Sequence, residues 1–185
     1  MKDFVYELFT GVGFLNQLFS LETAIYLSNI FERKLILIVM YPLCHIGASN
    51  WNYGKILDFF DKDALNRLLP FGLEVYYANH AVQYLNKNRG QMRLIDFPNR
   101  FSNIVLIDKD LNIPSNQKKI SNFCANRIPV IFDKNEYDDE KILITKSNAS
   151  RCFYNFFTTK DNYKLMNDIC SNLILNKEII DKIND

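Results

Sequence analysis

The stretch ELFTGVGFLNQLFSLETAIYLSNIF, residues Glu7–Phe31, decides the fold of this 185-residue chain. It places two glycines, Gly11 and Gly13, ahead of a long amphipathic run. The segment 4–9 before the glycines predicts a short strand, and the segment 14–32 after them predicts a helix with apolar residues at helical spacing. The stretch therefore predicts a strand, a tight turn and a helix in direct succession.

The next run, KLILIVMY at Lys34–Tyr41, is continuously apolar and ends at Pro42, which is typical of a strand buried on both faces. A strand–helix–strand unit implies a right-handed crossover and parallel strands. Further along the chain we expect helices at 55–69 and 81–86, strands at 73–77, 104–107, 130–132 and 142–145, an irregular polar stretch at 88–100, and helices at 162–173 and 176–185. The alternation predicts the α/β class, as one Rossmann-like domain over residues 1–185 whose mainly parallel sheet is flanked by helices.

Composition excludes several classes of function. Hydrophobic residues make up 48% of the chain, enough for a sizeable core, and the net charge is only +1. Nucleic-acid-binding domains carry a basic excess, so we expect no nucleic-acid partner. The four cysteines (Cys44, Cys124, Cys152, Cys170) form no C-x-x-C pair, so neither a zinc site nor a redox site is indicated, and we expect mostly buried, free thiols.

The first residues and the apolar runs bear on location. The segment that starts at Met1 has no apolar core and no small-residue cleavage site, so it does not read as a signal peptide. The longest apolar run, Leu35–Cys44, is about half of the ~20 residues that span a bilayer. We expect a soluble, cytoplasmic chain without a transmembrane segment.

The glycine turn has two interpretations. Ligands of open α/β sheets bind beyond the carboxyl ends of the strands, and a helix N-terminus there favours an anion. The dinucleotide fingerprint G-x-G-x-x-G is incomplete, because Asn16 stands at its third glycine, and no Gly-Lys-Ser/Thr of a P-loop follows. On spacing alone the turn is either an anion site or a purely structural bend.

The segment GVGFLNQLFSLETAIYLSNIFERKLILIVMYP resembles the first motif of the GDP-fucose O-fucosyltransferase family. Shared features are a glycine-rich turn, an Asn-Gln pair, a helix rich in Leu and Ala, a basic residue and an apolar strand that closes near proline. They fall here at Gly11, Gly13, Asn16, Gln17, Leu18, Ala24, Leu27, Lys34, 35–40 and Pro42. The segment Trp51–Leu65 is similar to a second family element, and the last fifteen residues resemble the helix that precedes the family's second domain.

The resemblance implies the N-terminal half of a GT-B-type glycosyltransferase. A complete enzyme of this kind transfers a deoxyhexose from a GDP-sugar to a hydroxyl of a glycan or protein acceptor, with inversion and without a metal or other cofactor. Its second domain opens with an H-x-R motif, and neither His45 nor His80 has that context. The resemblance therefore implies a missing second domain or a partner chain, and it leaves activity of this chain alone uncertain.

The candidate donor- and acceptor-binding residues lie in two segments. The first is the turn and helix start, with Gly11, Val12, Gly13, Phe14 and Asn16. The glycines allow close approach of the backbone to a pyrophosphate, and the Asn16 amide can contact a sugar or phosphate oxygen. Some relatives carry an acidic residue in this turn, a candidate general base; Val12 cannot take a proton, so a base must lie elsewhere.

The second segment follows the apolar strand and contains His45 and Trp51. His45 is a weak candidate for the catalytic base, and Trp51 offers a ring for a sugar face. The structural readings are a solvated loop histidine and a core aromatic. Other candidates weighed are Tyr53, His80, the pair Asp58 and Asp61, the D-K-D runs at 61–63 and 108–110, and the arginines Arg89, Arg93, Arg100, Arg127 and Arg151 as pyrophosphate partners.

Two other functional classes stay open. One is a non-catalytic Rossmann-like binding or assembly module that pairs with another chain, which an exposed apolar patch would mark. The other is an ordinary nucleotide or phosphate-ester enzyme, for which the sequence offers no acid, base or metal cluster.

Overall fold

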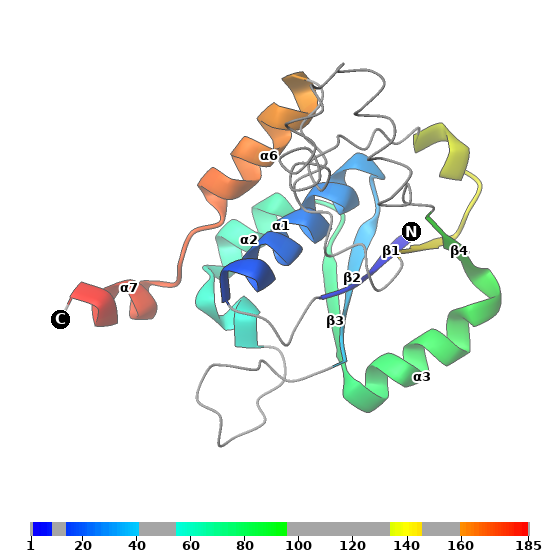
Figure 1. The fold of residues 1–185 in the computed structure, drawn as a ribbon, viewed down its shortest axis with the longest axis horizontal. Coiled ribbons are helices and arrows are strands. Elements are labelled where there is room, and N and C mark those ends of the chain that lie inside the picture. The colour runs from blue at the N-terminus through cyan, green and yellow to red at the C-terminus, as the bar shows by residue number, and fades with distance from the viewer. Residues whose placement is uncertain (1, 9–13, 41–54, 96–133, 146–159, 185) are drawn as a thin grey trace, which may run out of the picture.

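The computed structural model describes residues 2–8, 14–40, 55–95, 134–145 and 160–184. In these residues five parallel strands form one sheet in the order β3-β2-β1-β5-β4, with helices on both faces (Figure 1). The strands are β1 (Asp3–Glu7), β2 (Lys34–Val39), β3 (Leu73–Tyr77), β4 (Met92–Leu94) and β5 (Ile142–Ile144). The helices are α1 (Phe14–Ile30), α2 (Lys62–Leu68), α3 (Ala78–Asn88), α6 (Lys160–Asn172) and α7 (Lys177–Asn184). The predicted α/β class with a Rossmann-like parallel sheet is confirmed.

The helices divide between the two faces in the way that right-handed crossovers require. The chain moves from β1 through α1 to β2 and through α2 to β3, and both helices lie on one face together with α6. From β3, at one edge of the sheet, the chain returns through α3 on the opposite face to β4 at the other edge. Because these connections run in opposite directions on opposite faces of the sheet, the crossovers from β1 to β2, from β2 to β3 and from β3 to β4 have the same handedness.

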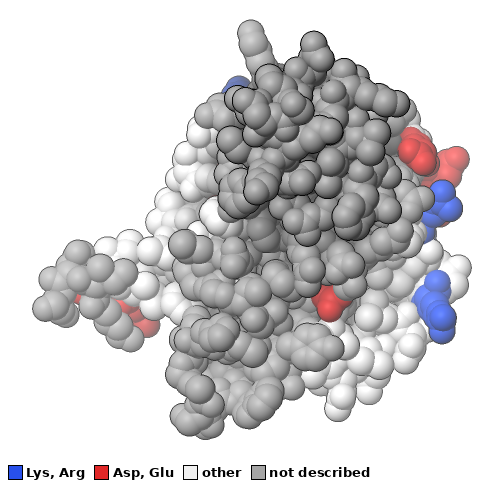
Figure 2. Space-filling view, in the orientation of Figure 1, with Lys and Arg blue, Asp and Glu red and all other residues white. Residues whose placement is uncertain are grey.

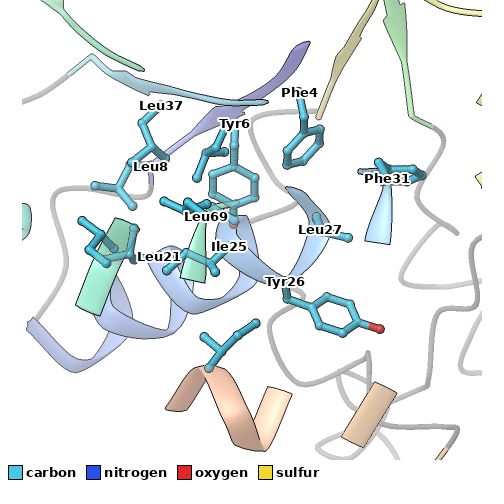
Figure 3. Packing of buried hydrophobic residues seen from close by; sticks show 14 of the residues in the cluster. Phe4, Tyr6, Leu8, Leu21, Ile25, Tyr26, Leu27, Phe31, Leu37 and Leu69 are labelled. Atoms are coloured by element: carbon cyan, nitrogen blue, oxygen red, sulfur yellow. The ribbon is translucent and has the colours of Figure 1, made fainter. Parts of the chain in front are cut away.

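The larger core lies between the sheet and α1, as Figure 3 shows. Alternate residues of β1 (Phe4, Tyr6 and the following Leu8) point toward α1, while Val5 points to the α3 face. Leu21, Ile25 and Leu27 of α1 meet them and are fully buried. Full burial of each such side chain contributes about 1.5–3 kcal/mol, so this layer is the main source of stability.

Helix α1 is buried on nearly every side. Residues 20–28 are all buried, including polar Ser20, Thr23 and Ser28. Their hydroxyls are satisfied locally: Thr23 donates to the carbonyl of Phe19 at 2.8 Å, and Ser28 donates to the carbonyl of Arg33 at 2.7 Å. A helix that is buried all round over its middle turns belongs to the interior of its domain.

A buried arginine, Arg33, holds the segment just before β5 in place. Arg33, 2% exposed, lies between α1 and β2. Its guanidinium donates to the carbonyl of Tyr137 at 2.5 Å and to that of Glu140 at 2.7 Å, just ahead of β5. Burial lowers the pKa of Arg33, and the nearby carboxylates of Asp138 and Glu140 oppose that shift. These bonds join residues more than one hundred positions apart and place β5 beside β1.

Three sequence expectations differ from the structure. The helix expected at 55–69 is broken into a 3₁₀ turn (Lys55–Phe59) and α2, because Asp61 caps α2 by accepting from the N–H of Ala64 at 2.8 Å. The stretch expected to be irregular contains strand β4. Helix α3 begins three residues earlier than expected and ends two later.

The remaining expected elements either agree with the structure or lie outside the described residues. Strands β1, β2, β3 and β5 and helices α1, α6 and α7 follow the predicted order, with ends within about two residues. The strands expected at 104–107 and 130–132 lie outside the described residues. None of the helices in the described part of the chain is long and apolar enough to cross a membrane.

Replacing Arg33 tests whether its hydrogen bonds to the carbonyls before β5 stabilise the fold. Arg33→Ala leaves the carbonyls of Tyr137 and Glu140 buried without their donor, so we expect the free energy of unfolding to fall by about 3 kcal/mol. Arg67→Ala, at an exposed position on α2, is the matched control and should change it by less than about 0.5 kcal/mol. Urea denaturation followed by circular dichroism measures both. Equal, small changes in the free energy of unfolding for the two variants would show that the hydrogen bonds of Arg33 are dispensable.

Candidate functional site

The candidate site lies at the carboxyl edge of β1 and β2, two neighbouring parallel strands. Glu7, the last residue of β1, is in register with Ile38 of β2. The N–H of Leu8 donates to the carbonyl of Ile38 at 2.9 Å, which extends the pairing by one residue. The two segments that carry the predicted site residues, 9–13 and 41–54, therefore leave the sheet from adjacent strands at the same edge. Parallel strands are about 4.8 Å apart, so both segments start close together.

The structure places part of the predicted set. Phe14 and Asn16 lie in the first turn of α1, directly after the glycine turn. Gly11, Val12 and Gly13 lie outside the described residues, as do His45 and Trp51. The described ends of β1 and α1 nevertheless fix what the turn joins: the carboxyl end of a central strand and the N-terminus of a buried helix. Free N–H groups and the helix dipole favour an anion at such a helix start.

Glu7 is a candidate that the sequence analysis missed. It stands at the carboxyl end of β1 on the face that carries α3, and it is partly buried. Burial raises the pKa of its carboxyl above the ordinary value of 4.5. A carboxyl with a raised pKa at this edge of a sheet is suited to accept a proton. The signal available in the sequence was a single acid within the expected strand of residues 4–9, shortly before the glycine turn.

Helix α1 is held against its neighbours at several points along its length. Gln17 is fully buried, and the hydroxyls of Tyr6 and Ser20 lie 3.4 Å apart, joining β1 to α1. At the other end of the helix, the Asn29 amide donates to the carbonyls of Ile25 and Leu68, each at 2.9 Å. These contacts fix the position of α1 relative to β1 and to the end of α2.

The other weighed residues of the described part lie at different places. Asp61 is the cap of α2. His80 is exposed in the first turn of α3 and follows the carboxyl end of β3, at the same end of the sheet but one strand beyond β2. Arg89 and Arg93 are exposed near β4, at the far side of the sheet. Tyr53, the arginines Arg100, Arg127 and Arg151, and the D-K-D run at 108–110 lie outside the described residues.

Charge and metal-binding groups add no further site in the described part of the chain. No three His, Cys, Asp or Glu side chains there come together in a way that could hold a metal ion. Acidic and basic side chains are intermixed on the face shown in Figure 2, without a patch of one sign among the described residues. Cys170 is free, as expected, but the residue as a whole is exposed, so the expected burial is wrong for it. Its sulfur lies beside the Glu22 carboxyl, and the partial burial of the sulfur there raises the pKa of the thiol to about 11. Cys44, Cys124 and Cys152 lie outside the described residues.

The raised pKa of Glu7 gives a pH dependence with a defined sign. The folded state binds the Glu7 proton more tightly than the unfolded chain, so this residue lowers stability as the pH rises above about 4.5. Glu7→Gln removes that loss. We expect the variant to melt at a higher temperature than the wild type at neutral pH and at the same temperature near pH 3. Glu136→Gln, an exposed control, should show no such pH-dependent difference; equal profiles for all three proteins would contradict the assignment.

Comparisons with protein-family models, with curated proteins and with solved structures find no match to this chain.

Proposed function

We propose that this chain is the N-terminal, Rossmann-like domain of a glycosyltransferase of the fucosyltransferase type. The observation that carries the proposal is the glycine turn of residues 11–13 with Asn16, which follows the carboxyl end of the central strand β1 and opens a helix buried in the core. Ligands of parallel sheets bind at this edge. The resemblance of the same segment to the fucosyltransferase motif supports a GDP-sugar as that ligand.

In the proposed reaction an acceptor hydroxyl attacks the anomeric carbon of the sugar and GDP leaves from the opposite face. The glycine turn and the N-terminus of α1 hold the phosphates or the sugar, and the Asn16 amide contacts a sugar or phosphate oxygen. Glu7 takes the proton of the attacking hydroxyl, the role that Val12 cannot fill. The raised pKa of Glu7 and its place at the end of β1 support this role.

Donor binding is the first test. Titration calorimetry of the chain with GDP-fucose should show binding that Gly13→Asp weakens at least about tenfold, because a carboxylate in the turn repels the phosphates. Gly90→Asp is the matched control, since Gly90 is exposed and a side chain added there meets nothing within 4 Å. Equal loss in both variants, or no binding by the wild type, would contradict the proposal for this chain.

The role of Glu7 as the general base is tested by measuring transfer of fucose with the complete protein that the gene encodes. Glu7→Gln should lower kcat by about 10²–10⁴-fold, the usual contribution of general-base catalysis, while GDP-fucose still binds. Asn16→Ala should weaken donor binding instead. Transfer that is unchanged in both variants would remove these residues from the site.

A second candidate is a binding module without catalysis that pairs with another chain. It is favoured by two exposed apolar side chains of the C-terminal segment, Ile174 at 46% and Ile180 at 38%. Helix α7, which carries Ile180, projects from the body of the domain in Figure 1. Failure to bind any GDP-sugar, together with capture of a second chain that Ile180→Asp abolishes, would favour this candidate.

A further inference from the structure

The outer edge of β3 has no strand paired with it in the described part of the chain. Within the described residues β3 pairs only with β2. The N–H of Leu35 donates to the carbonyl of Gly72 at 2.9 Å, which sets the alternation of the ladder. Glu74 and Tyr76 therefore direct their backbone groups toward β2, while Leu73 and Val75 direct theirs away from the sheet. Both Leu73 and Val75 are partly exposed.

The two edges of the sheet differ in how they are protected. The opposite edge strand, β4, has only three residues, and a very short edge strand discourages pairing with another strand. Each edge carries one exposed charged residue, Arg93 on β4 and Glu74 on β3. Strand β3 has five residues and reads LEVYY, with no proline and no lysine. An edge of this length and composition is a template for another strand.

An open groove of about 440 Å³ follows this edge on the α3 side. Val75, Tyr76 and Tyr77 line it from β3, and His80, Gln83 and Lys87 line it from α3. Its floor is the stacked ring pair of Tyr76 and Tyr84, whose centroids are 4.7 Å apart. A strand added to β3 would project alternate side chains into this groove.

The groove is fixed by a polar network that also presents a carboxylate. The hydroxyl of Tyr76 donates to Glu74 at 2.9 Å, and the hydroxyl of Tyr84 donates to Asp3 at 3.3 Å. Lys34 lies 2.7 Å from the Glu74 carboxylate. The Glu74 side chain is still 45% exposed. The edge thus offers a carboxylate on the strand, and a histidine and a lysine on the neighbouring helix.

We propose that β3 pairs antiparallel with β3 of a second copy of this chain, about a twofold axis at Val75. Val75 then meets its equivalent and the two residues exchange N–H···O=C bonds. Glu74 of each copy lies opposite Tyr76 of the other, over the groove that holds the other copy's His80 and Lys87. Because the axis is perpendicular to the sheet, the two α3 helices share one face.

Charge and symmetry favour a second copy over an unrelated extended peptide. The carboxylate of one copy meets the basic side chains of the other, and the same contact is repeated by the twofold axis. Such an isologous interface closes on itself, so the exposed edge of both copies is used at once. The proposal does not rest on donor binding, and its test uses no sugar nucleotide.

Sedimentation velocity of the chain from about 1 µM to about 1 mM tests the pairing. The wild type should form a concentration-dependent dimer. Val75→Pro removes an outward N–H that β2 does not use, and should weaken dimerisation at least about tenfold. The matched control is Leu94→Pro, because the N–H of Ile95 donates to Ile144 at 2.9 Å and that of Leu94 points outward from the opposite edge. Leu94→Pro should leave the dimer unchanged.

If circular dichroism shows that Val75→Pro does not fold, two further measurements test the proposed pairing. His80→Glu puts an acid opposite Glu74 of the second copy and should also weaken the dimer at least about tenfold, whereas Asn79→Glu, its exposed neighbour, should not. Hydrogen exchange at the Val75 amide should slow at dimer concentrations, and exchange at Leu94 should not. A wild type that is monomeric throughout the range, or a dimer indifferent to His80→Glu and without protection of Val75, would overturn the proposal.

Discussion

The structure depends on one buried guanidinium. Arg33 follows α1 and precedes β2, and it bonds the carbonyls of Tyr137 and Glu140 just before β5. A buried charge is costly unless it is fully paired, so these acceptors and Arg33 stabilise one another strongly. Through this contact, the β1–α1–β2 unit near the start of the chain holds in place a strand that lies more than one hundred residues later. In the sheet, β5 pairs with β1 on one side and with β4 on the other.

The same unit determines the candidate site. Helix α1 is buried all round, and its start is joined to β1 through Tyr6 and Ser20. The positions of the two elements that the glycine turn joins are therefore fixed by packing. Glu7 adds a carboxyl of raised pKa at the same edge. The surface that we propose for self-association lies apart from the end of β1, along β3.

Prediction from sequence succeeded where local patterns are strong. The apolar run of β2 and the periodic apolar residues of α1 gave the parallel unit, because burial on both faces leaves a clear signal. It failed where local and distant interactions compete. Asp61 ends the expected helix by capping a new one, and β4 consists of three residues that become a strand by pairing with β5. For the site, the sequence indicated the glycine turn but not Glu7, since an acid near a strand end acquires a raised pKa only when the fold buries it.

The sequence by itself determined the α/β class, the parallel pairing of β1 with β2 and the position of the glycine turn between strand and helix. These properties follow from hydrophobic periodicity and from glycine's conformational freedom, both local in the chain. Tertiary structure alone decided the strand order, the burial of Arg33 and Glu7, and which strand forms the open edge. Each of those depends on which distant segments pack together, and contacts between residues far apart leave no periodic trace in one sequence.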